Sequence, residues 1–219
     1  MIYTESISKI AESFKKLNLV KNVKYGYDNS IYNIVESVLS LNRDYDNQVI
    51  KMVNRFKEEY PEIKGINQFI CTFDNYKESD GKINFREYAR AFFGCYEVRK
   101  AEIIYNLVLK LKFIVKDVHP QNEFNVFSEW AKKTKPEEVY ILNIKNFKIA
   151  GFQYMRMLFG ADTVKPDRRI MRYVNSILGD GYEIKDELVI IKLFEDAAEE
   201  ANIPVIILNN TVWNKNGNN

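Results

Sequence analysis

The sequence predicts an all-α protein, one multi-helix domain with short connections. Apolar residues recur every three or four positions along most of the chain, which is the spacing of one helix face. The only run compatible with a strand is PVIIL at 204–208, and a buried helical turn explains it equally well. The 219 residues suit a single domain at 1–215, built as two closely packed lobes with enough length to bury a core.

In the first half of the chain, the apolar spacing predicts four helices, three of them at 4–20, 44–60 and 96–115. The remaining one runs through Leu39, with Asn29 or Ser30 as its N-cap. A turn at 79–81 is followed by a further helix that begins near residue 84.

In the second half, proline and glycine mark the expected boundaries. A short helix covers 136–142, and a second covers 148–159 and stops at Gly160. Pro166 opens a third helix, which closes at Gly179. A fourth covers 185–201, and the Asn-rich tail at 214–219 is expected to be disordered.

The composition excludes several classes of protein. Cys71 and Cys95 are too few for a disulfide framework and are expected to be buried free thiols in a reducing compartment. With His119 as the only histidine, neither a structural zinc site nor an iron–sulfur cluster is expected, and no cofactor is implied. No apolar run approaches the ~20 residues that span a bilayer. We therefore expect a cytoplasmic protein, and a monomer is favoured.

The net charge of +2 is small, but the charges are unevenly distributed. Between 141 and 175, seven basic residues stand against two acidic ones, and after 175 the balance reverses. The seven are Lys145, Lys148, Arg156, Lys165, Arg168, Arg169 and Arg172. This pattern is compatible with a phosphate-binding face, although on charge alone an alternation of solvated helix faces is the simpler explanation.

The segment 144–179 reads IKNFKIAGFQYMRMLFGADTVKPDRRIMRYVNSILG. It resembles the helix-hairpin-helix and the Pro/Asp loop of the HhH-GPD DNA glycosylase superfamily. In that family a hairpin leads into a helix that ends at a small residue or glycine, and a short loop then delivers an aspartate to the start of the next helix. LFG at 158–160 and KPDRRIMRYVNSILG after it follow this order, so Asp167 takes the position of the catalytic aspartate.

Two upstream segments agree with the resemblance. SVLSLNRDYDNQVIKMVNRFKEEYP at 37–61 is similar to an early helix pair of the family, with one residue inserted near Asp44. FFGCYEVRKAEIIYNLVLKL at 92–111 is similar to a later helix, with Gly94, Lys100 and Ala101 in register. The resemblance covers roughly residues 30–180 in the expected order, which implies an HhH-GPD-like fold.

The resemblance implies a DNA N-glycosylase in which the Asp167 carboxylate stabilises positive charge on the sugar or orients water. Bifunctional members carry a hairpin lysine, but Ile149 stands at that position here, so a monofunctional enzyme is expected. Lys145 and Phe147 stand where the family has hairpin glycines. A plain helix-capping role for Asp167 is the alternative to catalysis.

Double-stranded DNA is the expected partner. The residues expected to bind it are Lys145, Lys148, Arg156, Lys165, Arg168, Arg172 and Asn42. Asn42 falls near the family's glutamine that fills the space of an extruded base, although a polar residue ending a helix would explain it too. Two other functions stay open: a catalytically inactive module that binds nucleic acid or protein, and a structural or regulatory protein that does not bind nucleic acid.

Overall fold

The computed structural model describes residues 2–21, 25–179 and 183–215, and this part of the chain is helical with no strand, as predicted. Its first α-helices are α1 (Ile2–Lys15), α2 (Ser30–Leu39), α3 (Ile50–Glu59), α4 (Ile66–Thr72), α5 (Phe85–Phe93) and α6 (Val98–Leu111). The others are α7 (Glu123–Lys133), α8 (Val139–Leu142), α9 (Ile149–Leu158), α10 (Arg168–Leu178), α11 (Glu187–Ala201) and α12 (Val205–Lys215). The short helical turns are η1 (Tyr45–Val49, a π-helix) and three 3₁₀ turns, η2 (Phe73–Tyr76), η3 (Pro120–Asn122) and η4 (Pro136–Glu138).

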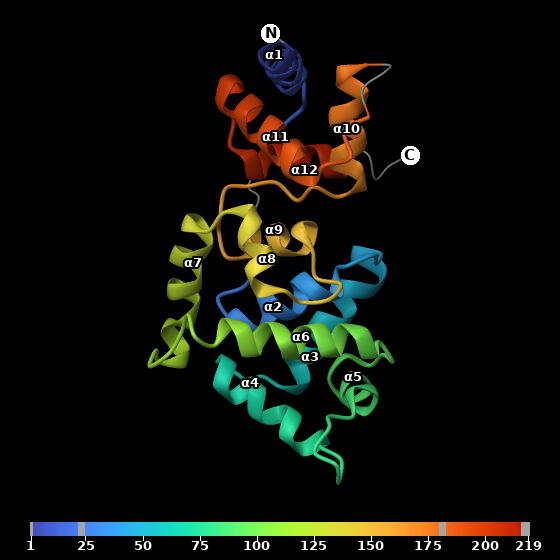
Figure 1. Ribbon diagram of the computed structural model, residues 1–219, viewed down its shortest axis with the longest axis vertical. Helices are drawn as coiled ribbons and strands as arrows, with labels where there is room; N and C mark the ends of the chain where they lie inside the picture. The colour runs from blue at the N-terminus through green and yellow to red at the C-terminus, as the bar shows by residue number, and fades with distance from the viewer. Residues whose placement is uncertain (1, 22–24, 180–182, 216–219) are drawn as a thin grey trace.

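The helices form two groups that pack against each other (Figure 1). Helices α1, α10, α11 and α12 lie together in the upper part of the view, and α2–α9 lie below them. Helix α1 packs on α10 and α11, so the two ends of the chain build the same group. One buried apolar cluster includes Phe14 and Phe194 of the upper group and Phe56 and Phe152 of the lower group, so a single core spans both.

Helix α2 is the centre of the lower group, because all ten of its residues are buried. It contacts α3, α4, α6, α7 and α9. Asn29 caps it, since the Asn29 side chain accepts a hydrogen bond from the Ile31 amide at 2.8 Å. A helix that is buried all round is expected to be apolar. Its one acidic residue, Glu36, is an exception to this pattern and needs hydrogen-bond donors inside the protein.

Some predicted boundaries differ from the structure. Helix α1 ends at Lys15 rather than near residue 20. The predicted 44–60 helix is divided into η1 and α3, because the π-helical turn that Asp44 caps precedes the regular helix. The ambiguous segment 204–208 begins α12 and is therefore helical apart from its first residue.

The structure also tests the predictions about the two cysteines, the C-terminal tail and membrane-spanning helices. Cys71 and Cys95 are free as predicted, but Cys71 is exposed and Cys95 only half-buried, so the prediction of buried thiols is wrong. Asn214, placed in the predicted disordered tail, lies in α12, and residues 216–219 lie outside the described residues. In the described ranges, no helix combines the length and the apolar character needed to cross a bilayer.

Candidate functional site

Asp167 lies immediately before α10 and caps it. Its Oδ1 atom accepts hydrogen bonds from the amides of Arg169 and Ile170, at 2.9 and 3.1 Å. Its second oxygen, Oδ2, accepts no hydrogen bond from any described residue. The free amides and dipole of a helix N-terminus stabilise an anion, so one oxygen holds the helix while the other remains available at a half-buried position.

Lys165, two residues earlier, is half-buried and turned toward the protein rather than extended into solvent. Its Nζ atom lies 4.2 Å from the centre of the Tyr154 ring, a cation–π contact. Burial lowers the pKa of Lys165, against the opposite influence of the Asp167 and Glu36 carboxylates. Its backbone amide donates to Asn209 Oδ1 of α12 at 3.1 Å, which ties this loop to the upper group.

The buried carboxylate of Glu36 accepts three tyrosine hydroxyl groups. Tyr27 donates to Oε2 at 2.6 Å, while Tyr45 and Tyr154 donate to Oε1 at 2.9 and 2.6 Å. Burial, together with the charge of Glu36, raises the pKa of each of these tyrosines. They therefore stay protonated and keep donating at neutral pH, which balances a carboxylate that is only 2% exposed.

Trp213 and Arg169 pack against the Glu36 cluster through Tyr45, where the two groups of helices meet. Trp213 of α12 packs edge-on against Tyr45, with ring centres 6.3 Å apart. The Arg169 guanidinium lies 4.1 Å from the Trp213 ring centre, and its Nη1 donates to the Trp213 carbonyl at 3.2 Å. The candidate site therefore combines α2, η1 and α9 of the lower group with α10 and α12 of the upper group.

The turn between α8 and α9 reaches its tight geometry without glycine. Asn143 and Asn146 adopt left-handed backbone angles, with φ of 49° and 67°. Asparagine tolerates this region better than other residues that carry a side chain. These two positions neighbour Lys145 and Phe147, which the resemblance places at the hairpin glycines. Asn143 and Asn146 were therefore a sequence signal for this tight turn, and the prediction did not use them.

The predicted DNA-binding residues divide into two sets. Lys145, Lys148, Arg168 and Arg172 are exposed. Arg156 is not, because it is 7% exposed and its guanidinium is engaged internally. Its Nε donates to the Ala131 carbonyl at 3.0 Å and its Nη1 to Gln153 Oε1 at 2.5 Å. The prediction that Arg156 binds DNA is therefore wrong.

Asn42 lies in the turn that follows α2, with φ of 53°, and its side chain is exposed. The left-handed backbone and the end of α2 at Leu39 agree with its interpretation as a residue that helps to end a helix. A contact between Asn42 and a base edge stays a prediction.

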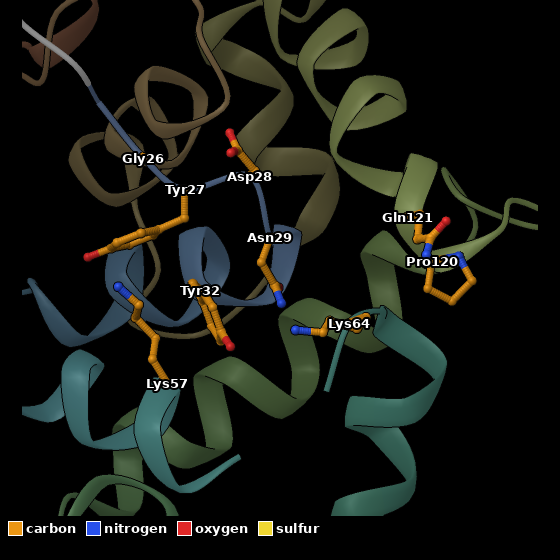
Figure 2. A pocket seen from close by; sticks show the side chains of 9 residues that line it. All are labelled: Gly26, Tyr27, Asp28, Asn29, Tyr32, Lys57, Lys64, Pro120 and Gln121. Carbon is orange, nitrogen blue, oxygen red and sulfur yellow. The ribbon is translucent and has the colours of Figure 1, made fainter. Parts of the chain in front are cut away.

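A separate hollow of about 460 Å³ opens at the start of α2 (Figure 2). It is lined by Gly26, Tyr27, Asp28, Asn29, Tyr32, Lys57, Lys64, Pro120 and Gln121. The Lys57 Nζ atom lies 4.5 Å from the Tyr27 ring centre, on the lower left of the view. None of the predicted site residues lines this hollow, and it touches the Glu36 cluster only through Tyr27.

Glu36 and its tyrosines were not predicted from the sequence, whereas Asp167 was. Tyr27, Tyr45 and Tyr154 lie far apart in the chain and share no spacing that marks a cluster. The one available signal was Glu36 itself, an acid in the largely apolar run IVESVL at 34–39. A buried acid must find hydrogen-bond donors, and their identity depends on the tertiary fold.

Among the described residues, no three His, Cys, Asp or Glu side chains are grouped so that they could hold a metal ion.

A family model described as a domain of unknown function, DUF8548, matches residues 5–216. No curated protein and no solved structure matches the chain.

Proposed function

We propose that this chain, which belongs to the DUF8548 family of domains of unknown function, is a DNA N-glycosylase-like protein with an HhH-GPD-like fold. It excises a damaged or modified base from double-stranded DNA. The observation that carries the proposal is the placement of Asp167. Its carboxylate stands at the N-terminus of α10, beside a half-buried lysine and an aromatic cluster, where the two groups of helices meet.

The order of the elements supports the proposal. Helix α8, a tight turn, α9, a loop and the Asp167-capped α10 follow one another along the chain. This is the order that the resemblance implies for a hairpin followed by an aspartate loop. The turn carries Lys145 and Lys148, both exposed, which provide side-chain contacts to phosphate in place of the close backbone approach that glycines allow.

The chemistry assigned to Asp167 follows from its environment. Breaking an N-glycosidic bond develops positive charge on the sugar, which a nearby carboxylate stabilises. Oδ1 is engaged with α10, while Oδ2 has no partner among the described residues and is free to face the sugar or a water molecule. Ile149 is buried in the first turn of α9, so no lysine occupies the family's nucleophile position, and a monofunctional hydrolysis is proposed.

The aromatic residues provide a place for an extruded base. A flipped base is commonly held by stacking on aromatic side chains and by hydrogen bonds to its edge. Tyr45 and Trp213, both half-buried and in edge contact with each other, offer such rings next to the Lys165–Tyr154 pair, since Tyr45 and Tyr154 share the Glu36 Oε1 acceptor. The exposed Arg168 and Arg172 of α10 are proposed to hold the flanking phosphates.

The second candidate is a catalytically inactive module that binds nucleic acid or a protein partner. A difference from the family pattern favours this candidate. The turn between α8 and α9 has no hairpin glycine, and Asn143 and Asn146 adopt its left-handed backbone angles instead. Their side chains occupy space where a glycine would let a phosphate approach the backbone closely. The two candidates differ in whether base release occurs at all.

The test is base release from a panel of duplexes that carry alkylated, deaminated or oxidised bases. The proposal predicts release from at least one duplex, with an abasic site and an intact strand as products. Heating in alkali after the reaction reveals abasic sites, and its omission reveals direct strand cleavage. Binding without release from any duplex in the panel would favour the inactive module.

A further inference from the structure

We propose that Lys165 is the general acid of this reaction, which rests on the proposed function: its ammonium gives a proton to the base as the base leaves. Asp167 then acts on the sugar and Lys165 on the base. The substrate class that follows is an uncharged damaged or modified base, because only such a base needs a proton in order to leave.

The first observation is that the Lys165 ammonium has donors without an acceptor. It makes no hydrogen bond and no ion pair with any described residue, although it is half-buried. Its Nζ atom instead lies over the face of the Tyr154 ring, 4.2 Å from the ring centre. Polar groups drawn out of water normally find partners. An ammonium held inside without one is placed to donate to a ligand atom.

The second observation is a tight turn that fixes Lys165 beside Asp167. The Asp167 amide donates to the Lys165 carbonyl at 2.7 Å, a bond between residues two apart that encloses the buried Pro166. Asn209 holds the Lys165 amide on one side, and α10 holds Asp167 on the other. A carboxylate and an ammonium are thereby presented from one rigid segment, which suits groups that act on the two sides of one bond.

Among the described residues, the charged groups that act on Lys165 come from different parts of the fold. Asp167 precedes α10, Glu36 lies on α2, and Lys100 lies on α6. The two carboxylates favour the charged amine, while Lys100 and above all burial oppose it. Tyr154 is neutral, because burial and Glu36 raise its pKa. Burial lowers the pKa of Lys165, which makes its ammonium a stronger acid than an exposed lysine.

The C1′–N bond breaks, and its electron pair leaves with the base while a proton passes from Lys165 Nζ to the base edge. The sugar is left as an oxocarbenium ion beside the Asp167 carboxylate. Water adds at C1′ and loses a proton to solvent, and Lys165 takes a proton back from solvent. The net reaction consumes one water and yields the free base and an abasic site.

The experiment compares two substrates in single-turnover assays: a duplex with 7-methylguanine, which is already cationic, and one with an uncharged deaminated or oxidised base. Lys165→Met keeps a long apolar side chain over Tyr154. Lys165→Arg keeps the charge but holds its proton too firmly to give it up. Both variants should lose about 100-fold in release of the uncharged base. Release of 7-methylguanine, if the parent releases it, should change by less than about threefold.

The pH profile provides a second readout. Parent release of the uncharged base should fall as the pH rises through the pKa of Lys165, and this limb should be absent from Lys165→Met. The matched control is Lys132→Met, an exposed lysine on α7 that pairs with Glu129 at 3.2 Å. It should behave as the parent in both assays. Thermal unfolding of every variant verifies that each is folded.

Three results would overturn the assignment of Lys165. The first is a parental rate in Lys165→Met. The second is an equal loss on both substrates. The third is a covalent protein–DNA adduct trapped by borohydride that needs Lys165, which would make it a nucleophile instead of an acid. The proposed function fails separately, when neither the parent nor any variant releases a base.

Discussion

At the scale of single residues, the Glu36 carboxylate connects parts of the chain that are distant in sequence. Its three donors come from the segment before α2, from η1 and from α9. Each of these bonds to a charged group is worth about 1.5–3 kcal/mol of net stability, and leaving a buried polar group unpaired costs about 1–3 kcal/mol. The cluster is therefore sensitive to loss of the shared acceptor.

Replacing Glu36 by Ala should destabilise the fold more than removing one donor. Glu36→Ala leaves three tyrosine hydroxyls without their acceptor and should lower the free energy of unfolding by about 3 kcal/mol. Tyr27→Phe removes one donor to the carboxylate and should cost about 1.5 kcal/mol. Urea denaturation measures both, with Glu59→Gln, which breaks only an exposed pair with Arg55, as the control. Equal losses from Glu36→Ala and Tyr27→Phe would contradict the shared-acceptor role.

Lys100 is a second buried charge, and it makes stability depend on pH. Its Nζ donates to the Leu39 carbonyl at the end of α2, at 2.6 Å. Burial, followed by the nearby Arg43, lowers its pKa from 10.5 to about 8. The unfolded chain thus binds more protons than the native one above about pH 8, so this residue makes stability rise with pH in that window.

Lys100→Met should remove this contribution to the pH dependence of the free energy of unfolding. Between about pH 8 and 10, the free energy of unfolding of the parent should gain relative to the variant. Below pH 8 the difference should be constant, because Lys100 is charged in both states there. Urea midpoints across this range measure the effect. A difference independent of pH would show that Lys100 titrates normally.

At the scale of elements, several boundaries follow from short-range chemistry. Asn29 and Asp167 cap α2 and α10 as their sequence positions suggested, because a capping side chain needs only the next few amides. The π-helical turn η1 and the division of 44–60 were not predictable, since they depend on Tyr45 reaching Glu36 and Trp213. Arg156 was misassigned for a similar reason, because the acceptor of its Nε is the Ala131 carbonyl of α7, which only the tertiary fold brings near.

The capping role of Asp167 can be separated from its proposed chemistry. Asp167→Ala removes the acceptor for two amides of α10 and should cost about 1 kcal/mol of stability. Asp167→Ser keeps a good capping oxygen and should retain most of that stability. Thermal unfolding compares the two variants. If Asp167→Ala is as stable as Asp167→Ser, the cap observed at α10 contributes little.

At the scale of the whole molecule, the two groups of helices meet at the candidate site, and exposed basic residues lie on α10 and on the turn between α8 and α9. Asp167 and the exposed Lys145, Lys148, Arg168 and Arg172 were identified from the sequence, because a local motif and local charge carry them. Lys165 was identified for a different role, since the direction of its side chain depends on Tyr154.

The exposed basic residues of α10 and of the turn between α8 and α9 give a prediction about DNA affinity. Binding to duplex DNA should weaken steeply with salt, because the basic side chains that neutralise phosphates release counterions. A triple variant of Lys145, Lys148 and Arg172 to Ala should bind more weakly and show a salt slope smaller by roughly 0.9 for each phosphate that is no longer neutralised. The matched control replaces the exposed Lys82, Lys116 and Lys132 and removes the same charge. Equal weakening by both triples would assign the effect to net charge alone.

The most direct measurement is the single-turnover rate of base release by Asp167→Asn, on the duplex from which the parent releases base fastest. Asparagine keeps the shape and the α10 cap but lacks the charge that the sugar cation requires. The rate should fall by at least about 100-fold while duplex affinity and thermal stability stay at parental values. Release by Asp167→Asn at the parental rate, or no release by the parent from any duplex, would contradict the account.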